Sequence, residues 1–231
     1  MPATKKNGSS ESVDNYLKAI LSLGGGEENR VTIKALAEHL SVAPASVTNM
    51  LQKLSAASAP LVRYERHRGV KLSRSGRKRA LEIVRHHRLI ETFLYRVLDY
   101  PLEEVHAEAE RLEHFISERF EERIAAKLGH PTIDPHGHSI PTLKGEVAAS
   151  EAILLADVVD PGTFRIDSVA DRDVRHVRWM EARGITPGAK LRVRATPSVA
   201  GYSLSVGRSG KPFTLSHEVA QQVRIVRLGD S

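Results

Sequence analysis

The sequence predicts a mainly α-helical protein that ends in a small all-β domain. Apolar residues spaced three and four apart fill most of the chain up to about Leu128, which is the pattern of amphipathic helices. A short basic β-hairpin interrupts that pattern, and brief β-prone runs separated by Gly and Pro follow Ala152. The chain has 231 residues, and we expect domains at 1–76, 77–143 and 151–231.

The composition excludes several classes of protein. There is no cysteine, which excludes a disulfide scaffold, a thiolate zinc site and a cysteine nucleophile. No apolar run reaches the length of about 18 residues that predicts a transmembrane helix. The polar start of the sequence also lacks the apolar core of a signal peptide. We therefore expect a cytoplasmic protein.

The first elements follow the order of a winged helix-turn-helix. A helix is expected at 12–23, a second at 31–40 with Thr32 at its start, and a third at 45–58 after the turn "SVAP". Residues 61–73 alternate as a β-hairpin with the basic tip "ERHRG". In a unit of this kind the second helix of the helix-turn-helix, here 45–58, lies in the major groove of DNA.

The middle of the chain is expected to be helical, and a loop and a β domain follow it. A long helix is expected at 73–98, an acidic helix from Pro101 to about Leu128, and a Gly-, Pro- and His-rich loop at 129–142. The short strands of the last domain suggest a small barrel that includes one helix ending at Gly184.

The charges are unevenly distributed along these elements, and the net charge is +6. From Arg63 to Arg88 there are ten Lys and Arg against two Glu, whereas from Asp99 to Glu122 there are nine Asp and Glu against two Arg. The first region suits a polyanion and the second suits a cation. A solvated helix face would give the same pattern for either run taken alone.

The DNA-contacting residues would come from the third helix and the hairpin. At the start of the helix the candidates for base and phosphate contacts are Ala43, Pro44, Ala45, Ser46, Thr48 and Asn49. On the hairpin the candidates for phosphate contacts are Arg63, Arg66, His67, Arg68 and Lys71. Any one polar residue of the helix could instead serve only as a cap. The ordered set of helices, basic hairpin and basic helix favours DNA binding.

Two helices carry a pattern typical of metal ligands. His87 and Glu91 are four residues apart and share one helix face, although a surface pair would look the same. The segment "VHAEAERLEH" (105–114) places four His and Glu side chains within roughly a 100° arc of a helix. Imidazole and carboxylate ligands without sulfur suit Mn(II) or Fe(II).

The segments "HRLIE" (87–91) and "VHAEAERLEH" together resemble the diphtheria-toxin-repressor family of iron- and manganese-dependent regulators. The resemblance covers nearly the whole chain. It implies a winged-helix domain, a helical metal-binding and dimerisation domain and an SH3-like (FeoA-like) C-terminal domain. It also implies a homodimer, not an enzyme, that binds a palindromic operator and represses manganese or iron uptake genes when Mn(II) or Fe(II) is bound.

The resemblance implies two metal centres. The first would use His87, Glu91 and His106, and the C-terminal domain would add ligands at Asp173 and His176, which are placed by the segment "GITPG". The alternative for the last two is that they are exposed residues on a helix. The remaining histidines carry less weight, and we expect the loop "DPHGH" to be solvated.

The second implied centre would use Glu110, Glu113, His114 and, from the first helix, Asn15. Iron-responsive members tend to have Met and Cys where this chain has Asn15 and Glu110, whereas manganese-responsive members tend to have Asp and Glu. Glu110 therefore favours Mn(II), and the neutral Asn15 is a weaker ligand than a carboxylate. Lys18 stands where some manganese-type members have an acid, and a cation there disfavours a close pair of metals. Zn(II), Co(II) or Cd(II) could bind in vitro.

Three other functions are compatible with parts of the pattern. A winged-helix regulator could respond to an organic ligand and use the His/Glu cluster as a structural zinc site. A metallohydrolase could use the same cluster, but the sequence has no HExxH or nucleophile motif. An activator would share the whole chemistry of a repressor. In a dimer, the apolar stretch 89–98 and the apolar stripe of the acidic helix are candidates for the contact between subunits.

Overall fold

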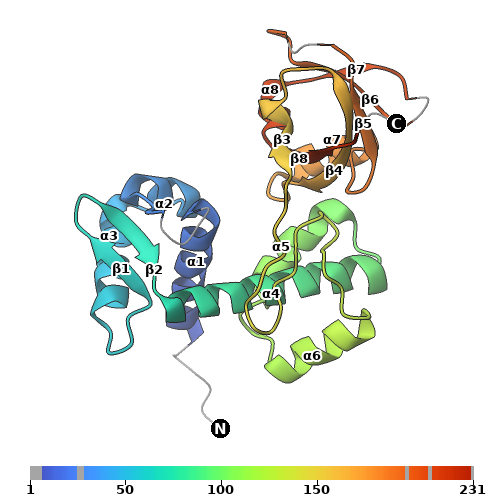
Figure 1. The fold of residues 1–231 in the computed structure, drawn as a ribbon. Helices are drawn as coiled ribbons and strands as arrows, with labels where there is room; N and C mark the ends of the chain where they lie inside the picture. The colour runs from blue at the N-terminus through green and yellow to red at the C-terminus, as the bar shows by residue number, and fades with distance from the viewer. Residues whose placement is uncertain (1–6, 25–28, 196–197, 208–209, 230–231) are drawn as a thin grey trace. The chain divides into compact units, whose positions relative to one another are not determined.

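The computed structural model describes residues 7–24, 29–195, 198–207 and 210–229. They form two compact units (Figure 1). The first unit comprises the described part of Met1–His86 with Glu113–Ile116 and Pro141–Glu146. The second comprises His87–Leu112, Ser117–Ile140 and the described part of Val147–Ser231. The long helix α4 (Arg74–Val97) contributes its first half to the first unit and its second half to the second.

The first unit is a winged helix-turn-helix. Its elements are α1 (Asn7–Gly24), α2 (Ile33–Leu40), α3 (Pro44–Ala56), β1 (Val62–Glu65) and β2 (Gly69–Leu72). Thr32 caps α2 as the sequence predicts, because its hydroxyl accepts a hydrogen bond from the amide of Ala35 at 3.1 Å. The apolar faces of all five elements meet in one core that includes Leu17, Leu36 and Leu51.

The second unit begins with the C-terminal half of α4, α5 (Leu102–Leu112) and α6 (Glu118–Lys127). The prediction of one acidic helix from Pro101 to about Leu128 is wrong. The helix ends at Leu112, and Ser117 caps a new one by accepting a hydrogen bond from the amide of Phe120. The intervening segment Glu113–Ile116 belongs to the first unit.

The C-terminal part of the second unit is a small barrel-like sheet. Its strands are β3 (Ile153–Leu154), β4 (Gly162–Val169), β5 (Lys190–Val193), β6 (Tyr202–Val206), β7 (Phe213–Leu215) and β8 (Val223–Arg227), in the spatial order β3-β8-β4-β5-β6-β7. The short helices η1 (Leu155–Asp157), α7 (Val174–Glu181) and α8 (His217–Ala220) accompany them.

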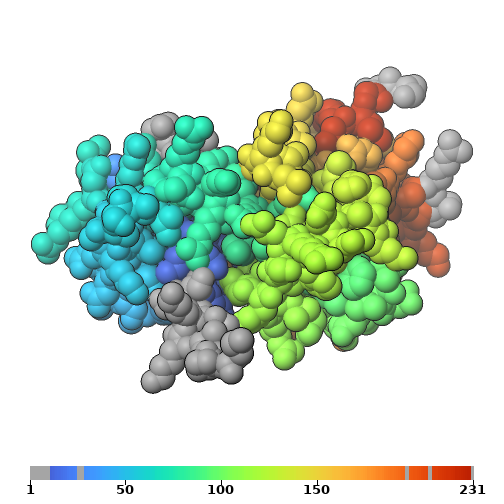
Figure 2. All heavy atoms as spheres, turned by 90° about the horizontal axis from the view of Figure 1, so that it is seen from below, coloured from blue at the N-terminus to red at the C-terminus, as the bar shows by residue number. Residues whose placement is uncertain are grey.

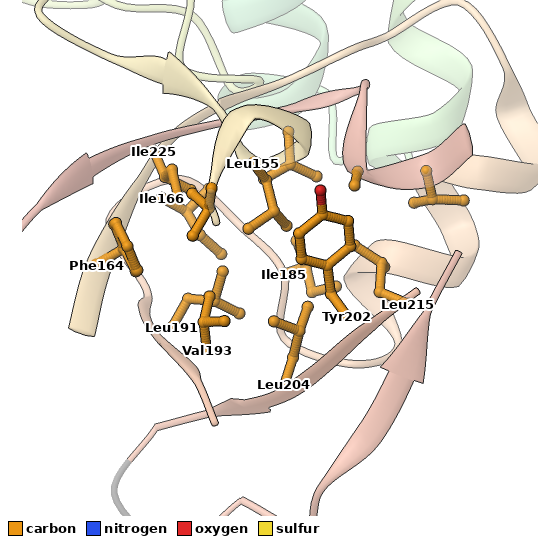
Figure 3. Packing of buried hydrophobic residues seen from close by; sticks show 14 of the residues in the cluster. Leu155, Phe164, Ile166, Ile185, Leu191, Val193, Tyr202, Leu204, Leu215 and Ile225 are labelled. Atoms are coloured by element: carbon orange, nitrogen blue, oxygen red, sulfur yellow. The ribbon is translucent and has the colours of Figure 1, made fainter. Parts of the chain in front are cut away.

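Alternate residues of these strands fill the core of this domain (Figure 3). Phe164, Leu191 and Leu204 point inward, and the hydroxyl of the buried Tyr202 donates a hydrogen bond to the carbonyl of Ala156 at 2.7 Å. The predicted fold class, mainly α with a small all-β C-terminal domain, is therefore confirmed. No helix within the described residues is long and apolar enough for a membrane span.

Replacement of Leu204 by Ala should lower the free energy of unfolding of the C-terminal domain by about 2–5 kcal/mol, because a fully buried side chain is truncated. Trp179, the only tryptophan of the chain, has its ring 6.1 Å from that of Phe213, so its fluorescence reports on this domain during urea unfolding. Val159→Ala is the matched control, since Val159 is 68% exposed. Equal midpoints for the two variants would contradict the assignment of this core.

Candidate metal centres

The second unit gathers three of the predicted ligands. His87 and Glu91 lie one turn apart on α4, and His106 projects from α5. One oxygen of Glu91, Oε1, lies 2.9 Å from Nε2 of His87 and 3.2 Å from Nδ1 of His106. The two imidazole nitrogens are 3.1 Å apart. Two helices thus bring a fully buried carboxylate and two imidazoles to one point. The spacing in the sequence predicts only that His87 and Glu91 share a helix face, and the family resemblance adds His106.

The loop after α6 adds candidate ligands that the sequence analysis missed. Asp134 accepts hydrogen bonds through Oδ1 from the amides of His136 and His138, which closes a tight turn. Gly137 has φ +91°, and a Cβ there would lie 2.1 Å from the carbonyl oxygen of Asp167, so only glycine fits against β4. The turn directs Nδ1 of His136 to 3.8 Å from Oε1 of Glu91.

The expectation that "DPHGH" is a solvated loop is therefore wrong. His136 is fully buried and Asp134 is 3% exposed. The spacing of the two histidines was the signal in the sequence. The polar composition of the loop alone suggested exposure to solvent. The contact that buries the loop is with β4, which is distant in the chain, so the local sequence does not reveal it.

Asp171, between β4 and α7, completes this group. Its Oδ2 lies 3.7 Å from Nδ1 of His106 and 3.6 Å from Nδ1 of His138. Ligand atoms of His87, Glu91, His106 and Asp171 all lie within 4.8 Å of one another. We call the set His87, Glu91, His106, Asp134, His136, His138 and Asp171 the second-unit cluster.

Asp173 and His176 do not join the second-unit cluster in the structure. Asp173 instead caps α7, and its Oδ1 accepts hydrogen bonds from the amides of Arg175 and His176. Nδ1 of His176 lies 3.0 Å from Oε1 of Gln222. The C-terminal domain does reach the cluster, but through Asp171, two residues before the predicted position. The capping role of Asp173 turns its side chain to its own helix.

In the second-unit cluster, burial and the attraction between opposite charges shift the pKa values in opposite directions. Burial alone would raise the pKa of Glu91, but His87, His106 and His136 hold it well below its ordinary value. Burial would lower the pKa of His136 and of His138, yet Glu91 and Asp134 raise them above their ordinary value. His138 and His106 likewise lower the pKa of Asp171 against the effect of burial.

Several buried atoms of the second-unit cluster have no hydrogen-bond partner. They are Oε2 of Glu91, Oδ2 of Asp134 and both ring nitrogens of His136. Leaving such atoms unpaired is costly, and nitrogen and oxygen atoms that converge in this way are the donors that Mn(II), Fe(II) and Zn(II) accept. The residues present therefore fit a divalent cation.

A smaller group lies in the first unit, where Glu113 and His114 pack against α1. Nζ of Lys18 lies 2.7 Å from Oε1 of Glu113, and Nδ1 of His114 lies 3.5 Å from Oδ2 of Asp14. Arg79 of α4 donates a hydrogen bond to Oδ1 of Asp14 at 2.6 Å. We call the set Asp14, Asn15, Lys18, Arg79, Glu113 and His114 the first-unit cluster.

The first-unit cluster also holds unsatisfied polar atoms. Oδ1 of Asn15 and both ring nitrogens of His114 are buried without a hydrogen-bond partner. Burial alone would raise the pKa of Asp14, but His114 and Arg79 bring it below its ordinary value. Glu110, the remaining predicted ligand, lies in the second unit with its Oε1 3.9 Å from Nε2 of His106.

The predicted DNA-contacting residues lie on the surface of the first unit. Around the start of α3, the exposed ones are Ala43, Pro44, Ala45, Ser46 and Asn49. Thr48 is half-buried, and its hydroxyl donates a hydrogen bond to the carbonyl of Pro44. On the hairpin, Arg63, Arg66, His67 and Arg68 are exposed and Lys71 is half-buried. Side chains of this teal hairpin project from the edge of the first unit in Figure 2.

A winged helix-turn-helix, together with buried clusters whose donor atoms fit a divalent cation, is the arrangement of a metal-dependent DNA-binding regulator. The chain matches the models of the iron dependent repressor N-terminal DNA binding domain over 9–70, of its metal binding and dimerisation domain over 73–142, and of the FeoA domain over 153–227. It is 30% identical to the iron-dependent repressor IdeR of Mycobacterium leprae, covering 94% of this chain and 98% of that protein. The chain therefore belongs to the iron-dependent repressor family, whose members regulate transcription and are not enzymes.

Manganese-responsive relatives are also similar. The chain is 36% identical to the transcriptional regulator MntR of Geobacillus kaustophilus over 46% of this chain and 72% of that one. A solved manganese-dependent transcriptional repressor in complex with manganese has a TM-score of 0.86 and 37% identity, and the match covers 94% of this chain and all of that one. The manganese-activated repressor ScaR in its apo form has a TM-score of 0.78 at 33% identity, over 93% of this chain and all of that one.

The metal-free protein should become less stable as pH rises above about 6.5. The folded state raises the pKa of His136 and His138 above the ordinary value of 6.5, so their contribution is complete below that value and is lost as pH rises through the raised values. The lowered pKa of Glu91 and Asp171 acts at the other end, where stability is lost as pH falls below their ordinary values. Thermal melting of the chelator-treated protein between pH 4 and pH 8.5 checks both limbs.

Saturating Mn(II) is the control for this pH profile. Metal binding requires unprotonated imidazoles, so the metal-loaded protein should instead gain stability as pH rises through neutrality. A metal-free melting temperature that increases steadily from pH 6 to pH 8 would contradict the assignment.

Proposed function

We propose that this protein is a manganese-activated repressor of metal-uptake genes that acts as a cytoplasmic homodimer on a palindromic operator. The observation that carries the proposal is the set of buried imidazole and carboxylate atoms without partners, in a chain of the iron-dependent repressor family. Ligand atoms of nitrogen and oxygen, with no sulfur among them, favour Mn(II) over softer ions. Fe(II) is the second candidate, and Zn(II), Co(II) or Cd(II) would bind in vitro.

We assign the metal ligands to the two clusters. In the second unit they are His87, Glu91, His106 and Asp171, with Asp134 and His136 in contact with the same carboxylate. In the first unit they are Asn15, Glu113 and His114. Glu110, which lies in the second unit, keeps the role that the sequence analysis gives it as a predicted ligand. A bound divalent cation would supply positive charge to carboxylates that are shielded from water.

The link to DNA binding runs through the segment Glu113–Ile116. This segment follows α5 directly in the chain but packs with α1 of the DNA-binding domain. A metal bound by residues of α1 and of this segment would fix the segment against the domain that carries α3. Such coupling is reciprocal, so operator DNA should tighten metal binding by the same factor.

A dimer needs an apolar surface, and α4 offers one. Leu102, Val105 and Ala109 of the predicted acidic stripe are buried within the chain itself and are not available for a partner. Tyr95, Val97 and Leu98 at the end of the stretch 89–98 are exposed and adjoin one another in sequence, so we assign the subunit contact there. A two-fold axis would then present two copies of α3 to the two halves of a palindrome.

Removal of metal should lower operator affinity by about 5- to 150-fold, the usual range of coupling between two sites, and Mn(II) should restore it. Glu113→Gln should abolish the response, because a neutral amide replaces a buried carboxylate ligand. Glu38→Gln, at a side chain that is 67% exposed, is the matched control. Fluorescence anisotropy with operator DNA measures both.

Two outcomes would reject this function. Equal affinity with and without metal would remove the metal as the signal. Unfolding of the protein on chelation, with DNA binding indifferent to added metal, would favour the alternative of a structural metal site in a regulator that responds to an organic ligand.

Arg66→Ala should weaken binding to all DNA sequences alike and reduce the slope of log affinity against log salt by about 1 for each phosphate that the variant no longer neutralises. Arg66 is exposed at the tip of the hairpin. Arg119→Ala, an exposed arginine of α6, is the control and should leave the slope unchanged. A weakening confined to one operator sequence would show that Arg66 reads a base rather than a phosphate.

A further inference from the structure

The first-unit cluster contains a cation of its own. Nζ of Lys18 lies 2.7 Å from Oε1 and 2.9 Å from Oε2 of Glu113, so the ammonium engages both oxygens of one carboxylate. The carboxylate is fully buried and the lysine side chain is 15% exposed. The two residues are 95 positions apart in the sequence, and α1 brings Lys18 to the segment Glu113–Ile116.

This ion pair gives the buried carboxylate of Glu113 the positive partner that a bound metal would otherwise provide. A buried carboxylate without a positive partner is strongly destabilising, and in the metal-free protein Lys18 supplies that partner. The other carboxylate of the cluster is treated in the same way, since Arg79 lies 2.6 Å from Asp14.

The second-unit cluster is built differently. The described partners of Glu91 are the imidazoles of His87, His106 and His136, and its Oε2 has no hydrogen-bond partner. An imidazole can lose its proton and become a ligand, whereas an ammonium group has no lone pair to offer. Metal binding adds to the second-unit cluster, but in the first-unit cluster it must displace a cation that is already in place.

We propose that Lys18 competes with the metal for Glu113 and so raises the metal concentration at which the first-unit cluster fills. The inference rests on the proposed function, because it takes Glu113 as a metal ligand. Lys18 is a residue that tunes the sensing threshold and is not itself a ligand. The second-unit cluster would fill at lower concentration, because the described partners of its central carboxylate, Glu91, are imidazoles. The basic side chain of Arg88 lies at Asp134 instead, 3.6 Å from Oδ2.

The test is Lys18→Met in the full-length protein, which keeps the length of the side chain and removes its charge. We expect Mn(II) binding to the weaker class of sites, measured by titration calorimetry, to tighten by about tenfold or more, the size of effect that a nearby like charge produces. We expect the metal-free protein to melt at a lower temperature, because Glu113 has lost its cation. If the variant folds only when Mn(II) is present, that also supports the exchange.

Three comparisons make the result specific. Lys34→Met removes a lysine from an exposed pair with Glu38 in the same domain and should change neither affinity nor melting. Lys18→Arg keeps the cation and should not tighten binding. In a Glu113→Gln background, Lys18→Met should no longer tighten binding, since the contested carboxylate is gone.

Unchanged or weaker Mn(II) binding in Lys18→Met, with the wild-type protein still activated by metal, would overturn this inference and leave the proposed function intact. A wild-type protein whose DNA binding ignores metal would overturn the function. The calorimetric comparison of Lys18→Met with wild type uses no DNA, so the two failures are distinguishable.

Discussion

The structure depends on one constraint, which is that carboxylates removed from water need positive partners. Glu91 and Glu113 are both fully buried or nearly so, and no apolar packing can compensate an isolated charge at such positions. The fold answers with basic side chains in the first unit, at Lys18 and Arg79, and with imidazoles in the second, around Glu91. In the first unit each of the carboxylates Glu113 and Asp14 therefore has a basic partner, although Oδ1 of Asn15 and both ring nitrogens of His114 have no hydrogen-bond partner. In the second unit, Oε2 of Glu91 and both ring nitrogens of His136 have no hydrogen-bond partner, and this difference underlies the two metal affinities that we propose.

The break between α5 and α6 decides where two of the buried polar side chains, Glu113 and His114, are placed. Had the acidic helix continued past Leu112, Glu113 and His114 would have stayed on the face of a helix in the second unit. The cap at Ser117 starts a new helix instead, and the residues between the two belong with α1. A short irregular segment therefore places Glu113 and His114, which we propose as ligands, in the same unit as the winged helix-turn-helix. Irregular backbone between rigid elements is a common position for functional residues because it can place a side chain where no helix face points.

The sequence predicted the elements better than the contacts between them. Helical periodicity located α2, α3 and α4 within a few residues, and the i, i+4 spacing of His87 and Glu91 predicted a shared face because both belong to one helix. Asp171 and His136 could not be found in this way. Asp171 becomes part of the cluster only because β4 delivers the chain there, and His136 only because Gly137 allows its turn to close against that strand. Asp173 was the more obvious acid, yet its position at the start of α7 makes it a cap. Contacts set by the meeting of distant segments have no local signature.

The winged-helix core bears on how a metal could regulate the protein. Its apolar cluster joins α1, α2, α3 and the hairpin, and the side chains of Leu17, Leu36, Val47 and Leu51 are fully buried without any contribution from a polar cluster. The start of α3 is exposed in the same arrangement. The core of this domain is thus apolar, in contrast to that of small zinc domains, whose folding depends on the bound metal. Because this core contains no residue of the first-unit cluster, the metal that we propose would act on what the domain is attached to, which is the segment Glu113–Ile116 and, through α4, the proposed surface between subunits. In the function that we propose, metal would control the placement of two such domains in a dimer and not their folding.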